Sequence, residues 1–318
     1  MGLKLGCNIS TFDSTTAPTD MFTAVLDQAL AAERAGFDVV TLGDHLYATP
    51  GAPDEPTMEV YTTLAALASR TSSIQLSAMV TSNTFRNPAL LAKMVTTLDV
   101  ISGGRAVLGV GAGWFEPEHD GYGLEFPTVT ERLDRFEEAL RILAPMLRGE
   151  RPTLDGRWYR VHEAINEPRV RDDLPVMVGG GGERRTFACA ARYADHLNIT
   201  CLPTQLPAKL RALEARCAEA DRDPGTLEVS FATPMVINED GAKAREQVEQ
   251  ILREFGMDPA TASEIFFFGT PAEVTAQLGE KVLAHGVDRL MVNLFAAGRD
   301  PDVITLAGHT LAPLVAST

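Results

Sequence analysis

Long apolar stretches, cysteine pairs and a surplus of basic residues are all missing from this 318-residue sequence. No run of about 18 apolar residues occurs, so we expect no transmembrane helix. The first residues lack the basic-then-apolar pattern of a secretory signal, and we expect a cytoplasmic protein. The four cysteines (Cys7, Cys189, Cys201 and Cys217) show neither CxxC nor zinc spacing, which predicts reduced thiols rather than a disulfide framework.

The charge balance is strongly acidic, because 43 Asp and Glu residues outnumber 28 Lys and Arg residues and give a formal net charge of −15. Such a surface repels phosphate backbones and anionic lipid, so we expect neither nucleic acid nor a membrane as a partner. An anionic ligand would have to be held locally, by helix N-termini and a few arginines. The binding partner that we expect is therefore a small-molecule substrate.

Short apolar runs alternate with longer stretches of helical periodicity almost from end to end. The expected strands cover residues 3–9, 37–42, 74–81, 106–110, 175–178, 196–199, 227–237 and 287–294. The expected helices cover residues 19–36, 57–71, 88–101, 129–148, 183–193, 205–221, 241–255 and 271–285, with a last helix from about residue 301. Eight β/α units predict one (β/α)8 TIM barrel over residues 1–318, with an open doubly wound sheet as the main rival.

Two stretches interrupt the alternation. Residues 150–174 contain a hairpin-like turn at 155–159, and residues 256–270 contain the apolar run 265–268. Insertions of this length are typical of lids or interface elements.

Ligands of a (β/α)8 barrel bind at the C-terminal ends of its strands, so the residues that follow each strand are the candidates for a site. Cofactor contacts are expected after the fourth strand from Gly111, Ala112, Gly113 and Trp114, and after the fifth from Gly179, Gly180, Gly181, Gly182, Glu183 and Arg184. A tight turn needs one glycine, whereas four in a row before a helix favour a phosphate cradle. Neither a P-loop nor a good GxGxxG fingerprint is present.

His45 is the best catalytic candidate, because it follows Asp44 directly at the end of the second expected strand. Imidazole groups pass protons near neutral pH, and a neighbouring Asp44 could fix the tautomer. The alternative is structural: Asp44 caps a helix beside a hydrogen-bonded His45. If His45 is not the relay, His119 and Glu118 are the next candidates. The histidines show no HxH or HExxH spacing, so no metal site is expected.

Several segments resemble the deazaflavin-dependent members of the luciferase-like superfamily. The residues that carry the resemblance are Gly-Asp-His-Leu at 43–46, Ser-Gly-Gly-Arg at 102–105, Gly-Val-Gly-Ala-Gly-Trp at 109–114 with Glu118 beyond it, Val-Gly-Gly-Gly-Gly-Glu-Arg-Arg-Thr at 178–186 and Ala-Asp-His-Leu-Asn at 194–198. Together these segments span most of the chain.

The resemblance implies a (β/α)8 barrel, usually a homodimer, with coenzyme F420 or a flavin across the strand ends. It also implies a non-proline cis peptide bond, which here corresponds to Met79–Val80, with Met79, Val80 and Thr81 near the cofactor ring. Trp114 and Pro117 stand where those members carry Glu-x-x-Asn, so flavin mononucleotide (FMN) stays an alternative cofactor.

Three hypotheses follow for the function. The first is hydride transfer between coenzyme F420 and a small organic substrate, with His45 as proton relay. The second is a monooxygenase that receives reduced FMN from a partner reductase. The third is a carrier or sensor that binds a flavin-type ligand without turnover.

Overall fold

The computed structural model describes residues 2–9, 16–49, 55–295 and 299–316. Eight parallel strands form a closed barrel, because each pairs with the next barrel strand along the chain and the last pairs with the first. The barrel strands are β1 (Lys4–Asn8), β2 (Val39–Leu42), β3 (Gln75–Ala78), β5 (Ala106–Gly111), β8 (Val176–Gly179), β9 (His196–Ile199), β10 (Glu228–Ile237) and β12 (Arg289–Asn293). The predicted (β/α)8 barrel is confirmed, and the open doubly wound sheet is excluded.

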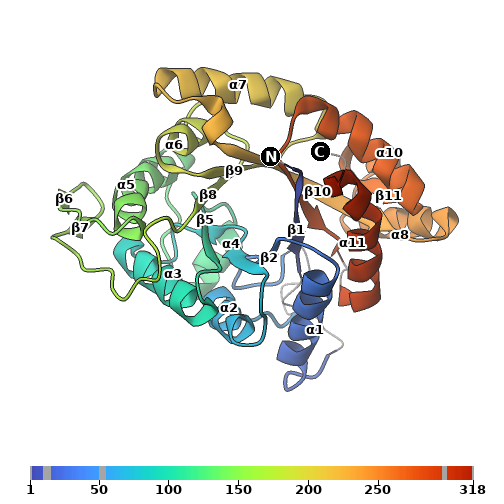
Figure 1. Cartoon of the computed structure of the whole chain (residues 1–318), viewed down its shortest axis with the longest axis horizontal. Helices are drawn as coiled ribbons and strands as arrows, with labels where there is room; N and C mark the ends of the chain where they lie inside the picture. Colours follow the sequence, from blue (N-terminus) through green and yellow to red (C-terminus); the bar gives the residue numbers. More distant parts are fainter. Residues whose placement is uncertain (1, 10–15, 50–54, 296–298, 317–318) are drawn as a thin grey trace.

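Helices surround the barrel on its outer side (Figure 1). They are α1 (Met21–Arg34), α2 (Val60–Ala68), α3 (Pro88–Ser102), α5 (Val129–Leu147), α6 (Thr186–Tyr193), α7 (Leu206–Glu219), α8 (Gly241–Glu254), α10 (Pro271–Lys281) and α11 (Pro301–Ala316). The main core lies between barrel and helices and includes the fully buried side chains of Phe136 and Phe187. Within the described ranges, no helix has both the length and the apolar character needed to cross a membrane.

Two helices begin three residues later than the sequence predicts. Helix α2 starts at Val60 rather than at residue 57, because the side chain of Glu59 caps it by accepting a hydrogen bond from the amide of Thr62. Helix α6 starts at Thr186 rather than at residue 183, because residues 183–185 form a turn. The short helix α4 (Glu116–Tyr122) was not predicted.

Glycines inside the barrel make room for neighbouring groups. A Cβ atom at Gly6 would lie 2.4 Å from the sulfur of Met291, and one at Gly109 would lie 2.0 Å from the carbonyl oxygen of Ala78. Gly109 therefore requires glycine if β3 and β5 are to keep their present spacing, whereas a side chain at Gly6 would have to displace the flexible end of Met291.

The excursion over residues 150–174 contains an antiparallel pair, β6 (Leu154–Asp155) and β7 (Arg160–Val161), which confirms the predicted hairpin. It projects beyond α5 at the edge of the molecule in Figure 1. Arg171, at the far end of the excursion, forms a 2.8 Å ion pair with the buried Asp99 of α3. This contact fixes the return of the chain into β8.

Residues 256–270 form an ordered extension of the sheet, and their predicted role as a lid or interface element stays a prediction. They contain α9 (Ala262–Ile265) and β11 (Phe267–Gly269), and β11 pairs in parallel with the outer half of β10. The run 265–268 is apolar because it belongs to this added strand and to a second small core around Val248 and Phe266. The stretch is therefore a β/α extension of the sheet beside the barrel.

Candidate active site

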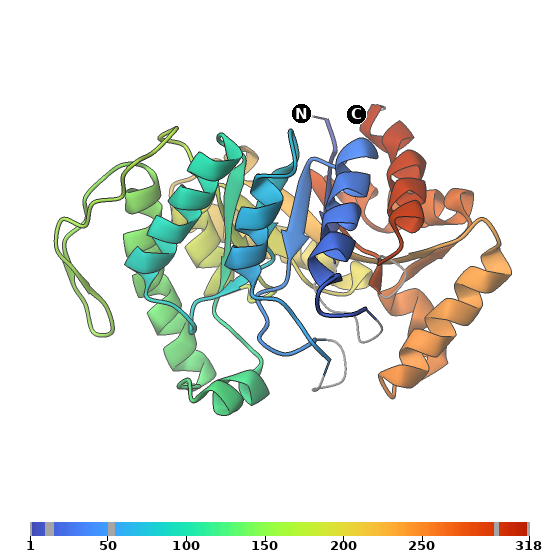
Figure 2. The same cartoon turned by 90° about the horizontal axis from the view of Figure 1, so that it is seen from below.

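A cavity of about 470 Å³ opens at the C-terminal ends of the barrel strands. In Figure 2, β1 runs from the N-terminus at the top, so this end of the barrel is at the bottom, where α4 lies. Most of the predicted site residues line the cavity: Asp44, His45, Met79, Val80, Thr81, Gly111, Ala112, Gly113, Trp114, Gly179 and Gly180. Its volume falls in the range of sites for small molecules and cofactors, about 300–1,000 Å³.

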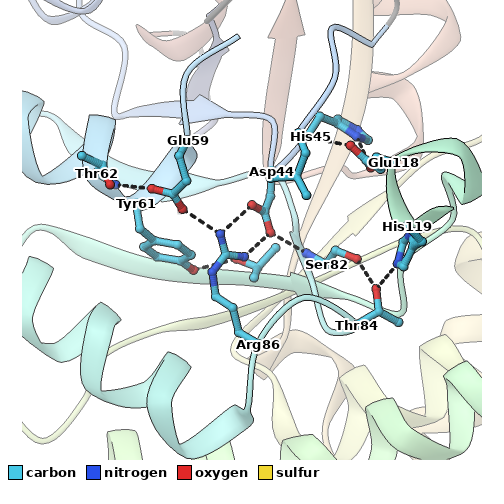
Figure 3. A network of polar contacts seen from close by, with 12 residues as sticks. Asp44, His45, Glu59, Tyr61, Thr62, Ser82, Thr84, Arg86, Glu118 and His119 are labelled. Carbon is cyan, nitrogen blue, oxygen red and sulfur yellow. Dashed lines mark hydrogen bonds and ion pairs between the residues drawn. The ribbon is translucent and has the colours of Figure 1, made fainter. Parts of the chain in front are cut away.

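Asp44 is buried and holds Arg86 through two hydrogen bonds, from Nη1 to Oδ2 at 2.6 Å and from Nη2 to Oδ1 at 3.0 Å. The amide of Ser82 donates a third, at 2.9 Å to Oδ2 (Figure 3). Burial raises the pKa of the Asp44 carboxyl, although Arg86 and the Ser82 amide both oppose the rise. Asp44 thus joins the end of β2 to the segment 82–86 that follows β3.

The hydrogen-bond network of Asp44 continues through Arg86 to Glu59 (Figure 3). Its Nη2 also donates to Oε1 of Glu59 at 2.7 Å, and its guanidinium lies 5.0 Å from the ring centroid of Tyr61. The Tyr61 hydroxyl lies 2.6 Å from Oγ1 of Thr81, a cavity residue. The network therefore holds one wall of the cavity in place from behind.

His45 is held by Glu118 of α4. Nδ1 of His45 lies 2.9 Å from Oε1 of Glu118, and Oε2 accepts hydrogen bonds from the amides of Leu46 at 2.7 Å and Tyr47 at 3.4 Å. Glu118 is only 2% exposed. A carboxylate accepts hydrogen bonds and donates none, so Nδ1 of His45 must be the donor and carries a proton. Nε2 is then the nitrogen left for a ligand.

The prediction that Asp44 fixes the tautomer of His45 is wrong. Both oxygens of Asp44 are occupied by Arg86 and Ser82, and the partner of the imidazole is Glu118. The ring of Trp114 stands edge-on to His45, with centroids 5.6 Å apart, and Trp114 itself is 64% exposed at the rim.

His119 has a structural environment instead. It is fully buried, its Nδ1 lies 2.8 Å from the carbonyl oxygen of Phe115, and its Nε2 lies 2.7 Å from Oγ1 of Thr84. Both ring nitrogens are therefore engaged inside the protein, and the rings of Phe85 and Phe126 pack against it. His119 supports the Thr84–Ser82 contact and does not line the cavity.

The bond between Met79 and Val80 is cis, as the resemblance implied. The side chain of Val80 lies between two glycines. A Cβ atom at Gly179 would come within 2.7 Å of Cγ1 of Val80, and one at Gly111 within 2.8 Å of Cγ2. Only glycine at these two positions leaves Val80 where it is, so the glycines of β5 and β8 shape the cavity floor.

The glycine loop reaches the cavity only at its beginning. Gly180, with φ +142°, lies on the wall, whereas Glu183 and Arg184 are exposed outside it. A Cβ atom at Gly181 would lie 2.6 Å from the carbonyl oxygen of Thr200, which shows a close approach of loop and strand end. The predicted cofactor contacts at Gly181, Gly182, Glu183 and Arg184 therefore lie beyond the cavity and stay predictions.

The prediction of the site omitted five lining residues: Ser82, Thr186, Asn198, Thr200 and Ala232. Asn198 lies near the C-terminal end of β9 and Thr200 directly follows it, so both carried a signal as residues on the ligand-binding face. Ala232 carried none, because it lies in the middle of a long strand.

Two proteins of named activity are similar to this chain over most of its length. The chain is 28% identical over 268 residues to a 5,10-methylenetetrahydromethanopterin reductase of Methanolobus tindarius, covering 80% of this chain and 78% of the relative. It is 30% identical over 282 residues to an F420-dependent glucose-6-phosphate dehydrogenase of Microbacterium testaceum (strain StLB037), covering 87% and 80%.

An F420-dependent secondary alcohol dehydrogenase, solved with an F420–acetone adduct, has a similar fold, with a TM-score of 0.82, 23% identity and 99% of both chains covered. The family described as luciferase-like monooxygenase matches residues 4–281. The chain belongs to the luciferase-like monooxygenase family.

Proposed function

We propose that this chain is an oxidoreductase that transfers a hydride between coenzyme F420 and a small organic substrate. The cofactor is supported by the names of the glucose-6-phosphate dehydrogenase relative and of the fold neighbour, which both state F420 dependence. The observation that carries the proposal is His45 on the cavity wall, with Nδ1 held by a buried Glu118 and Nε2 left for a ligand. Such a pair can pass a proton while a hydride moves.

The residues around the cavity fit a flat ring system. Gly111 and Gly179 leave room for the Val80 side chain between them, and a larger residue at either position would collide with it. Val80 and these two glycines give the cavity an apolar stretch of wall, which suits the face of a deazaflavin ring. A cavity of about 470 Å³ has room for the ring and a small substrate.

The glycine loop fits the phosphate of the cofactor's side chain. No described residue accepts a hydrogen bond from the backbone amides of residues 181–184, and Arg184 is exposed beside them. Arg185 is already paired with Asp134, and Lys209 forms a 3.0 Å ion pair with Glu183. Free amides before a helix bind phosphate, so Gly181, Gly182 and Arg184 are the residues that would hold it.

When bound, the deazaflavin supplies a ring carbon that donates or accepts hydride and reacts poorly with oxygen. His45 holds the transferable proton at Nε2, taking it from a substrate hydroxyl in oxidation or giving it to a carbonyl or imine in reduction. Glu118 keeps the imidazole in one tautomer and stabilises it when it becomes charged.

Titration of the purified protein with F420 and, separately, with FMN tests the cofactor. We expect saturable F420 binding in the micromolar range or tighter, and FMN binding at least tenfold weaker. Tight FMN binding without F420 binding would overturn the proposal.

A monooxygenase is the second candidate, because the matched family is described by that activity. In that reaction His45 would act as a base beside reduced FMN, with oxygen as co-substrate and a partner reductase as electron source. FMN-dependent consumption of oxygen by the protein would favour it.

A further inference from the structure

Behind the cavity, a chain of hydrogen bonds runs through the barrel interior from β9 to β10. The Asn198 side chain lines the cavity, and its Oδ1 lies 2.8 Å from Oγ of Ser230. The same Oγ lies 2.6 Å from Nε2 of His196. All three residues are buried, and none belongs to the His45–Glu118 pair.

The far end of this chain meets a charged cluster. Nδ1 of His196 lies 3.8 Å from Oε1 of Glu228, and Glu228 pairs with both Lys4 and Arg289. At 3.8 Å the Glu228 oxygen is too far from Nδ1 for a hydrogen bond, so this contact does not fix the position of the ring proton.

The direction of each hydrogen bond in the chain follows from the single proton of the Ser230 hydroxyl. Burial, with Arg289 nearby, lowers the pKa of His196 to about 3, so the ring is neutral and carries one proton. Oδ1 of Asn198 can only accept, so the hydroxyl proton of Ser230 goes to Asn198. Oγ of Ser230 therefore accepts from Nε2 of His196, which carries the ring proton. The amide group of Asn198 is thereby fixed with its nitrogen as the free end.

We propose that Asn198 donates a hydrogen bond from Nδ2 to a carbonyl oxygen of the ring system bound in the cavity, and that Ser230 and His196 are positioning residues for it. No described residue accepts from Nδ2. The inference rests on the proposed function, because deazaflavins and flavins carry such carbonyls on their pyrimidine ring.

The position of Asn198 favours the cofactor over the substrate as the acceptor. Asn198 is opposite Gly179 in the register of β8 and β9, and its carbonyl oxygen accepts from the amide of Gly180 at 3.0 Å. The donor on β9 therefore lies next to Gly179 and Gly180, whereas His45 follows a different strand, β2.

Two substitutions of Asn198 report which end of the amide faces the ligand. Asn198→Leu removes the donor, and Asn198→Asp keeps an acceptor for Ser230 but turns a carboxylate oxygen toward the cavity. We expect the F420 Kd to rise about fivefold to tenfold for Asn198→Leu and further for Asn198→Asp. Tighter binding by the Asp variant than by the Leu variant would show that an oxygen faces the ligand and would overturn the proposal.

The positioning role is tested with Ser230→Ala, against Ser77→Ala as a matched control. Ser77 is an equally buried barrel residue whose hydroxyl donates to the carbonyl of Ala78 and does not contact Asn198. We expect Ser230→Ala to raise the F420 Kd about threefold or more and Ser77→Ala to leave it unchanged. In the Asn198→Leu background, Ser230→Ala should have no further effect. Equal effects of the two alanine variants would contradict a positioning role.

Infrared difference spectra of bound F420 give a readout independent of turnover. Loss of the Asn198 donor should move a ring carbonyl stretch to higher wavenumber, and so should Ser230→Ala. Unchanged carbonyl bands in variants that still bind would refute the donor.

If an effect on the substrate KM appeared instead, with cofactor bands unchanged, the acceptor would be the substrate and the assignment to the cofactor would be wrong. Failure of the wild type to bind F420 would refute the proposed function itself.

Discussion

Glu118 and His45, which are 73 residues apart in the chain, meet at 2.9 Å and form the one carboxylate–imidazole pair that lines the cavity within the described residues. The adjacent Asp44 makes no such contact and is bonded to Arg86. The two acidic groups beside the site therefore have separate tasks, since one orients the imidazole and the other secures the wall. Variants of each should differ in what they lose.

Replacement of His45 should remove the proton relay. We expect His45→Ala and His45→Gln to lower kcat by about 10²- to 10⁴-fold, while cofactor affinity changes by less than tenfold. Steady-state kinetics and cofactor titration on the same preparations measure both. Full activity in a folded variant would exclude His45 as the relay.

Replacement of Glu118 should act through His45. In Glu118→Gln the amide oxygen can still accept from Leu46 and Tyr47, but the amide nitrogen donates to Nδ1 and shifts the ring proton to Nε2. We expect kcat to fall about 10- to 100-fold with an altered pH profile and a small change in Tm. A wild-type pH profile would contradict the orienting role.

Replacement of Asp44 should chiefly cost stability. Asp44→Asn removes the buried anion that neutralises Arg86, and loss of one partner of a buried pair typically destabilises by about 3 kcal/mol. Chemical denaturation measures this loss. If Asp44→Asn instead kept its stability and lost as much kcat as His45→Ala, Asp44 would have a direct catalytic part.

The glycine loop should tolerate no side chain at Gly180. Gly180→Ala places an L-residue at φ +142° on the cavity wall, so we expect a loss of about 1–2 kcal/mol in stability and at least a tenfold rise in the cofactor Kd. Gly36→Ala is the matched control, because Gly36 has φ +85°, open space around it and no place in the cavity. Both variants should lose stability, and only Gly180→Ala should lose affinity; equal affinities would argue against the loop as a cofactor contact.

The stability of the protein should fall in mild acid because of His196. Its folded-state pKa is about 3 against an ordinary value of 6.5, so the unfolded chain binds more protons between these two pH values. Stability from this group is fully present above pH 6.5 and decreases as the pH falls toward 3, by about 1.4 kcal/mol per unit at most. His196→Gln should flatten the slope in denaturation series; an unchanged slope would contradict a buried neutral His196.

The barrel could be predicted from sequence because strand and helix periodicities are local and regular. The added strand β11 could not be predicted, because its three residues are recognisable as a strand only through their pairing with the outer half of β10. The cluster of site residues was predictable once the barrel was, since the C-terminal ends of all barrel strands converge on one face.

The partners within the site were beyond prediction from sequence. Asp44 is followed directly by His45, and adjacency suggested a contact, but neighbouring side chains after a strand diverge and their partners come from distant segments. The homodimer and the partner reductase stay predictions.

Oxygen dependence tests the central claim most directly. The protein should be incubated with reduced F420 and a panel of conjugated carbonyl compounds and imines, and with oxidised F420 and secondary alcohols, and the deazaflavin absorbance followed with and without oxygen. Hydride transfer predicts that substrate-dependent absorbance changes proceed at the same rate in both atmospheres and are lost in His45→Ala. A strict requirement for oxygen together with reduced FMN, and no change with F420, would contradict the account.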